Sequence, residues 1–218
     1  MPTISPTPVG QTPKPLGLNL SWPPEAKTAI ADILSRYPED RSRSALIPLL
    51  HLAQRTFGGW LSVDALQLVA DTLNLPYIRV YEVASFYTMF NLKPVGQHHL
   101  QVCTNCACLI RGSDKIVDAV KAHTGLTGSG QTTPDGTFTL TEVECLGACV
   151  AAPMMQVTTA TGATHYFTHL TPEKTQEILT ELQAIGTSLH VDTPPAPVDP
   201  ISHGLYPEPE ANQKERKK

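Results

Sequence analysis

Two closely spaced pairs of cysteines constrain the fold of this chain more than any other feature of its sequence. Cys103 and Cys108 have four residues between them, and Cys145 and Cys149 have three. Each pair follows a strand-like run, so two short loops can bring four thiolates to one centre. Four thiolates without an obligatory histidine suit an iron–sulfur cluster or a structural zinc ion.

The spacing favours the cluster over zinc. Zinc ribbons usually have two residues between paired cysteines, and the wider spacing here can enclose a larger object, with each loop supplying both ligands of one iron in a 2Fe–2S centre. Two alternatives stay open: a zinc-stabilised interaction module, and reduced buried thiols that act as small apolar side chains. The second alternative, buried thiols, is disfavoured by the small residues beside the cysteines, which leave room for a bulky group: Gly112, Gly147 and Ala148.

A fifth cysteine, Cys106, creates an alternative interpretation. Cys103-Thr-Asn-Cys106 is also the C-x-x-C pattern of dithiol oxidoreductases, placed between a strand and a helix. That interpretation leaves Cys108, Cys145 and Cys149 without a role, whereas a cluster leaves only Cys106 over. We therefore expect Cys106 to be a non-ligand at the tip of the loop.

Composition excludes several classes of protein. The chain has 218 residues, a formal charge of −4 and no basic patch of the kind that nucleic acid requires. No apolar stretch approaches the roughly 20 residues of a membrane span. The N-terminal residues resemble neither a signal peptide nor a mitochondrial presequence, which predicts a reducing, cytoplasmic location. We expect membrane association only through partners.

The pattern changes twice along the chain and predicts an α+β fold. Residues 1–20 form a Pro-rich arm that we expect to be disordered, and residues 189–218 form a Pro-rich tail. Between them, helical periodicity predicts a bundle over 21–95, with helices near 23–37, 44–53, 63–73 and 77–86. Over residues 96–188, the pattern predicts the order β-α-β-β-β-α, which is compatible with a thioredoxin-like domain. The expected strands are 98–103, 138–143, 155–158 and 165–167, and the expected helices are 112–123 and 171–185. A right-handed crossover would place both cysteine loops at the same end of neighbouring strands.

A longer pattern now resembles a known family. The chain contains Gly59-Trp-Leu, the string Ile78-Arg-Val-Tyr-Glu-Val-Ala-Ser-Phe-Tyr-Thr-Met-Phe-Asn-Leu-Lys-Pro-Val-Gly96, and both cysteine loops. Over about residues 22–189 it closely resembles the thioredoxin-like 2Fe–2S subunit of bacterial and mitochondrial NADH:quinone oxidoreductase (respiratory complex I). The string and the two cysteine spacings together are highly specific.

The resemblance implies a site, a cofactor and partners. The family's ligands carry over to Cys103, Cys108, Cys145 and Cys149, which would hold one 2Fe–2S cluster. A partner flavoprotein would bind NADH and FMN, and this chain would exchange single electrons with that FMN. The larger iron–sulfur subunit of the peripheral arm is the second expected partner, at the cytoplasmic, inner face of a bacterial cell membrane.

A second assignment keeps the cluster but places it elsewhere. Diaphorase-type subunits of NAD-linked hydrogenases and formate dehydrogenases share the loop pattern, although the long string ending at Gly96 favours the respiratory enzyme. The sequence has no G-x-G-x-x-G motif after a strand and no P-loop, so we expect no NADH site and no catalytic residue in this chain. The whole complex, not the isolated chain, would be the enzyme.

Neighbouring residues suggest further roles. Arg111 could favour the reduced cluster, whereas Glu142 and Glu144 would lower its reduction potential. We expect His98, His99 and His165 at the surface or on a pocket wall rather than as ligands. The aromatic segment Tyr81–Phe90 predicts either an interdomain core or a docking surface for the flavoprotein.

Overall fold

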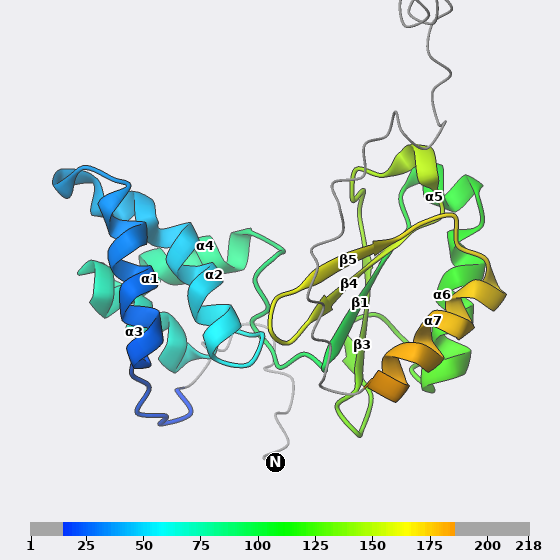
Figure 1. Cartoon of the computed structure of the whole chain (residues 1–218), viewed down its shortest axis with the longest axis horizontal. Helices are drawn as coiled ribbons and strands as arrows, with labels where there is room; N and C mark the ends of the chain where they lie inside the picture. The colour runs from blue at the N-terminus through cyan, green and yellow to red at the C-terminus, as the bar shows by residue number, and fades with distance from the viewer. Residues whose placement is uncertain (1–14, 186–218) are drawn as a thin grey trace, which may run out of the picture. The chain divides into compact units, whose positions relative to one another are not determined.

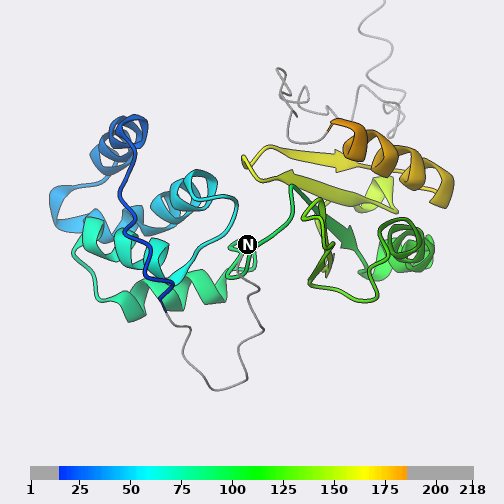
Figure 2. The same ribbon diagram turned by 90° about the horizontal axis from the view of Figure 1, so that it is seen from below.

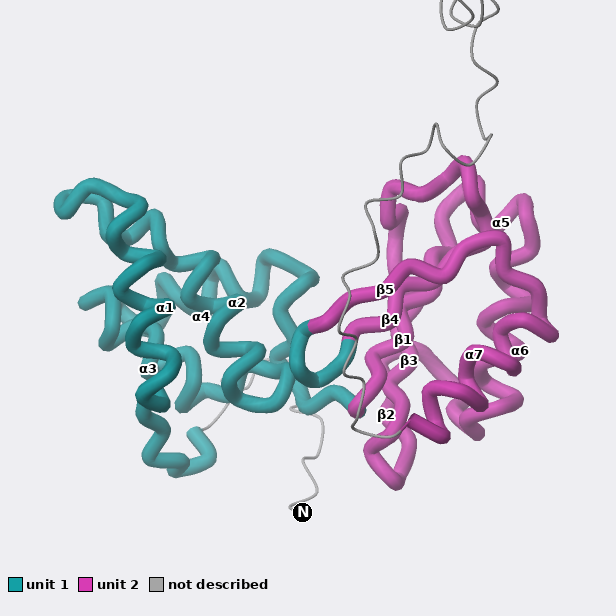
Figure 3. Tube along the Cα trace, viewed as in Figure 1, with its two compact units in different colours: residues 1–96, 159–162 teal, residues 97–158, 163–218 magenta. Residues whose placement is uncertain are grey.

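The fold is described by a computed structural model for residues 15–185, which form two units (Figure 3). Among these residues, the first unit comprises 15–96 and Thr159–Gly162, and the second comprises Gln97–Thr158 and 163–185. Most of the predicted arm over 1–20 and all of the predicted tail over 189–218 lie outside the described residues. Within 15–185, no helix has the length and hydrophobicity that a membrane span needs.

The first unit is built from helices, as the periodicity predicts. Its elements are α1 (Pro24–Ser35), the 3-10 helix η1 (Glu39–Ala45), α2 (Leu46–Thr56), α3 (Val63–Leu73) and α4 (Tyr77–Phe86) (Figure 1). The Ser62 hydroxyl accepts a hydrogen bond from the Ala65 N–H at 3.1 Å and caps α3, which satisfies one of the free N–H groups of its first turn. Apolar side chains from all four α-helices form one core, including Ile33, Leu49, Leu50, Leu66, Val69 and Val80.

The start of the second helix differs from the prediction. Ser44 lies in η1, and α2 begins at Leu46 rather than at Ser44. Pro48 therefore occupies the first turn of α2, where its missing N–H removes no intrahelical hydrogen bond.

The second unit is a five-stranded sheet with helices. The strands β1 (His98–Cys103), β2 (Gln131–Thr132), β3 (Phe138–Val143), β4 (Met155–Thr159) and β5 (Thr164–Phe167) lie in the order β2-β3-β1-β4-β5. The helices are α5 (Cys106–Ile110), α6 (Ser113–Thr124) and α7 (Pro172–Ile185), with the 3-10 turn η2 at Cys149–Ala151. Helices α6 and α7 lie next to each other (Figures 1 and 2) and share one apolar core with the sheet, including Leu100, Ile116, Val120, Leu140, Val157 and Leu179.

The pairing of β1 with β3 positions the cysteine loops. The two strands are parallel neighbours, with Cys103 opposite Val143 at the end of the ladder. The carboxyl ends of parallel strands meet at one edge of a sheet, so the segments after Cys103 and after Val143 leave from the same edge. The predicted strand neighbours are confirmed.

Two short elements were not predicted from the sequence. Helix α5 has five residues and β2 has two. Neither is long enough to show a hydrophobic period. At the start of α5, the Asn105 side chain accepts a hydrogen bond from the Cys106 N–H at 2.7 Å.

The prediction for His98 and His99 as surface or pocket-wall residues is wrong, because β1 is the central strand and both are buried. The ring of His98 packs on Phe138, with centroids 5.7 Å apart, and His99 Nε2 lies 2.8 Å from Thr141 Oγ1. Burial lowers the pKa of His99 from 6.5 to about 4.

This burial predicts a pH dependence of stability. The unfolded chain binds a proton at His99 below pH 6.5 and the folded chain only near pH 4, so the stabilisation is complete above pH 6.5 and is lost as the pH falls towards 4. The free energy of unfolding should fall by up to about 1.4 kcal/mol per pH unit in this window. Urea unfolding of His99→Gln, which keeps a polar partner for Thr141, should show a flatter profile. An unchanged slope in His99→Gln would contradict the assignment.

Candidate metal centre

The structure brings the four predicted cysteines to one end of the sheet. Cys103 is the last residue of β1, and Cys108 lies inside α5, three positions after Asn105, which caps that helix. Cys145 lies two residues after β3, and Cys149 is the first residue of η2. Two loops from neighbouring strands therefore carry one pair each.

The thiols form two pairs that also face each other. Cys145 Sγ and Cys149 Sγ lie 3.2 Å apart, and the thiols of Cys103 and Cys108 are hydrogen-bonded to each other. Cys149 also interacts electrostatically with Cys103 and Cys108, which links the pairs across the loops. Cys106 is exposed, and in the described part of the chain its thiol forms no hydrogen bond with another cysteine.

The two pairs differ in their surroundings. Cys103 and Cys108 are 2% and 1% exposed, among Ala152, Met154 and the partly buried Ala107. Cys145 and Cys149 are exposed. One pair is therefore shielded from solvent and the other faces it.

Burial and hydrogen bonds set the acidity of the thiols. Burial is the largest cause that raises the pKa of Cys108 to about 11, and the hydrogen bond with Cys103 adds to it. A backbone hydrogen bond from Met154 lowers this pKa in part. Two hydrogen bonds lower the pKa of Cys145: first the bond from the Cys149 thiol, then the bond from the Gly147 N–H, which lies 3.4 Å from Cys145 Sγ. The same thiol–thiol bond raises the pKa of Cys149. The same N–H groups would donate to thiolate sulfur around a bound metal.

The donor set suits either kind of metal centre. Four cysteine sulfurs are soft donors that suit both iron–sulfur clusters and zinc. Among residues 15–185, no three Cys, His, Asp or Glu side chains are grouped closely enough to hold a metal ion, so the four cysteines stand as two separate pairs. A 2Fe–2S centre would take two thiolates on each of its two irons.

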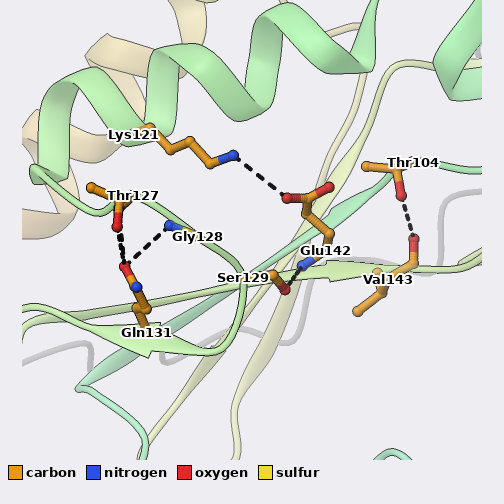
Figure 4. A network of polar contacts seen from close by, with 8 residues as sticks. All are labelled: Thr104, Lys121, Thr127, Gly128, Ser129, Gln131, Glu142 and Val143. Atoms are coloured by element: carbon orange, nitrogen blue, oxygen red, sulfur yellow. Dashed lines mark hydrogen bonds and ion pairs between the residues drawn. The ribbon is translucent and has the colours of Figure 1, made fainter.

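The charged neighbours lie in different settings. Glu142 forms an ion pair with Lys121 of α6 at 3.6 Å, and its N–H donates to Ser129 Oγ at 2.9 Å (Figure 4). The Arg111 side chain is exposed at the end of α5, and its role in favouring a reduced cluster stays a prediction.

The structure adds two polar contacts that the sequence analysis did not find. Asn105 Nδ2 donates to Glu144 Oε2 at 2.7 Å, which joins the two loops, and the Tyr166 hydroxyl donates to the Leu146 carbonyl at 3.0 Å, inside the second loop. Both join residues that are distant in sequence. Only the preference of Asn for helix N-caps could have drawn attention to Asn105.

Comparison with known proteins decides the family. A sequence model described as the thioredoxin-like [2Fe-2S] ferredoxin matches residues 30–183, most of the described chain. The chain belongs to this family. The predicted α+β fold with a thioredoxin-like domain is confirmed, and so is the resemblance to the 2Fe–2S subunit of NADH:quinone oxidoreductase.

Similar proteins carry the names of NADH-quinone oxidoreductase subunits or of an NADH dehydrogenase flavoprotein. An NADH-quinone oxidoreductase subunit of Rickettsia bellii is 48% identical over 165 residues, which cover 76% of this chain and 95% of the relative. The protein of the same name from Rickettsia conorii is 50% identical over 152 residues, covering 70% and 87%. NADH dehydrogenase [ubiquinone] flavoprotein 2, mitochondrial, of Dictyostelium discoideum is 53% identical over 126 residues, covering 58% of this chain and 51% of the relative.

A solved structure supports the fold alone. An NAD+-reducing [NiFe]-hydrogenase in the air-oxidised state aligns with a TM-score of 0.55 at 21% identity, over 64% of this chain and 23% of the hydrogenase chain. The fold is therefore shared with part of that enzyme at low sequence identity.

The asymmetric burial of the pairs predicts unequal thiol reactivity. In the reduced, metal-free chain, iodoacetamide at pH 8 should modify Cys106, Cys145 and Cys149 at least about tenfold faster than Cys108, because Cys108 is buried and its pKa is raised. Peptide mass spectrometry over a time course measures each site. Equal rates at Cys108 and Cys145 would contradict the described burial, and guanidinium-unfolded chain, in which all five should react alike, is the control.

Proposed function

We propose that Cys103, Cys108, Cys145 and Cys149 hold one 2Fe–2S cluster, and that the chain is the electron-transfer subunit of an NADH-quinone oxidoreductase. The observation that carries the proposal is the delivery of two thiol pairs to one edge of a sheet by two parallel strands. Relatives about half identical over most of this chain, which are named as subunits of that enzyme, support the choice of enzyme.

The protein's residues determine how electrons would reach the site. When bound, a 2Fe–2S cluster supplies one-electron oxidation and reduction. Cys103 and Cys108 lie behind apolar side chains, while Cys145 and Cys149 face solvent, so we propose that a redox partner approaches from the side of the second loop. The N–H groups of Met154 and Gly147 donate towards sulfur and stabilise added negative charge.

The partners follow from the same assignment. The sequence has no dinucleotide-binding motif, and we propose that a flavoprotein subunit carries FMN and the NADH site, with the larger iron–sulfur subunit of the peripheral arm as a second neighbour. The chain would then reach the cytoplasmic face of the membrane only through this complex. We also propose that residues 21–95 and 96–188 act as the two domains of the subunit.

A diaphorase-type subunit of an NAD-linked hydrogenase is the second candidate. The hydrogenase alignment favours it, but at 21% identity that alignment concerns the fold alone. The respiratory relatives are about twice as similar in sequence and match over a larger share of this chain. Co-purification of the native complex with its neighbouring subunits separates the two candidates.

Metal content and a cysteine series test the site. Chain purified without oxygen should hold about two irons and two sulfides and show a rhombic EPR signal on reduction. Cys108→Ser should lose most of this signal and of the visible absorbance, and Cys106→Ser, a change of the same size two residues away, should keep both. One zinc per chain with no EPR signal would instead select the interaction module, and loss of colour in Cys106→Ser alone would reverse the ligand assignment.

The aromatic segment that sequence analysis singled out divides into two parts. Phe90 is 5% exposed and packs on His51, with ring centroids 4.9 Å apart, whereas Phe86 is 76% and Met89 42% exposed. Phe90 belongs to the core of the first unit, so the interdomain core stays a prediction, whereas the docking prediction suits the exposed Phe86, Tyr87 and Met89. We propose that this exposed group contacts the flavoprotein, since aromatic and Met side chains are enriched at interfaces.

Paired alanine variants test the docking proposal. Phe90→Ala should lower the free energy of unfolding by about 3 kcal/mol through a cavity in the first unit, measured by urea unfolding. Phe86→Ala should leave the unfolding free energy within about 0.5 kcal/mol of wild type, yet weaken capture of the flavoprotein at least about tenfold. Undiminished capture with Phe86→Ala and Tyr87→Ala combined would reject this surface.

A further inference from the structure

A side-chain hydrogen bond joins the two cysteine loops beyond the end of the sheet. Asn105 Nδ2 donates to Glu144 Oε2 at 2.7 Å, across 39 residues of sequence. Asn105 lies between Cys103 and Cys106, and Glu144 directly precedes Cys145. The bond therefore connects the loop that carries the buried thiol pair with the loop that carries the exposed pair.

This bond lies just beyond the last residue pair of the two strands. Cys103 and Val143 are the last pair of the β1–β3 register. Next along the chain, the N–H and the hydroxyl of Thr104 both donate to the Val143 carbonyl, at 3.0 and 3.4 Å (Figure 4). The following residues, Asn105 and Glu144, make their contact through side chains, because the backbones no longer pair there.

Two partners fix the orientation of the Asn105 amide. Its Oδ1 accepts from the Cys106 N–H at 2.7 Å and caps α5, so its nitrogen is the atom directed at Glu144. A carboxylate can only accept, which requires the same orientation. One side chain thus ties the start of α5, the helix that carries Cys108, to the residue before Cys145.

We infer that Asn105 and Glu144 are positioning residues that hold the two cysteine pairs at the separation a two-iron centre requires. The inference rests on the proposed function, in which each loop supplies both ligands of one iron. Neither side chain is a ligand, and both act by fixing one loop against the other. Glu144 is exposed and Asn105 half-buried, so loss of this charge-assisted bond should change cluster retention by about fivefold.

The structure offers a matched control for the charge of Glu144. Glu142 is a second carboxylate at the end of β3, but its partners are Lys121 and Ser129 rather than the first loop (Figure 4). Glu142→Gln therefore removes the same charge from the same segment without changing the contact to Asn105.

Exchange of donor and acceptor tests the pair. Asn105→Asp keeps the acceptor for the Cys106 N–H but places two carboxylates opposite each other. A chelator should then remove iron at least about fivefold faster than from the wild-type chain. The rate is measured as loss of visible absorbance in the full chain under anaerobic conditions. Adding Glu144→Gln places an amide donor opposite the new carboxylate and should return the rate to within about twofold of wild type. The EPR signal of the reduced chain should change in Asn105→Asp and return in the exchanged double variant.

The control variant decides between geometry and charge. Glu142→Gln in the Asn105→Asp background restores the same net charge and should leave iron loss fast. Equal rescue by Glu142→Gln, or a wild-type rate in Asn105→Asp, would overturn the positioning role while the cluster itself remains. If the wild-type chain takes up neither iron nor sulfide, the proposed function fails together with the inference drawn from it.

Discussion

Parallel pairing of β1 with β3 is the constraint on which the site depends. The two strands are separated by α5, α6 and β2 in sequence, yet they end side by side with Cys103 opposite Val143. Backbone hydrogen bonds and the shared apolar core beneath the sheet fix this register. Because a parallel pair brings both carboxyl ends to one edge, the two cysteine loops leave the sheet at the same edge although they are about forty residues apart in sequence.

The site that results is asymmetric, and polar side chains hold its loops where the strands stop. Apolar side chains enclose Cys103 and Cys108, whereas Cys145 and Cys149 are exposed, so solvent reaches one thiol pair and not the other. Backbone in such loops cannot pair with a neighbouring strand, and side-chain contacts such as that of Asn105 are the remaining way to restrict it. The chain belongs to the thioredoxin-like [2Fe-2S] ferredoxin family, and contacts of this kind are what we propose to hold its cysteine loops in place.

Local order could be predicted from the sequence because its causes are local. The helix α3 with its Ser62 cap, the helix α4 and the strands β1 and β3 appear at the predicted residues, since hydrophobic periodicity and capping act within a few positions. The paired cysteines also indicated a cluster through spacing alone. Helix α5 was missed because five residues carry no period.

Tertiary structure decided everything that depends on distant residues. It buried His98 and His99 on a central strand, separated the buried Phe90 from the exposed Phe86, and divided the cysteines into a shielded and an open pair. It also brought Asn105 to Glu144 across 39 residues. The sequence by itself determined which side chains could serve the centre, whereas only the fold determined which of them face each other, because packing and strand register are properties of the whole unit.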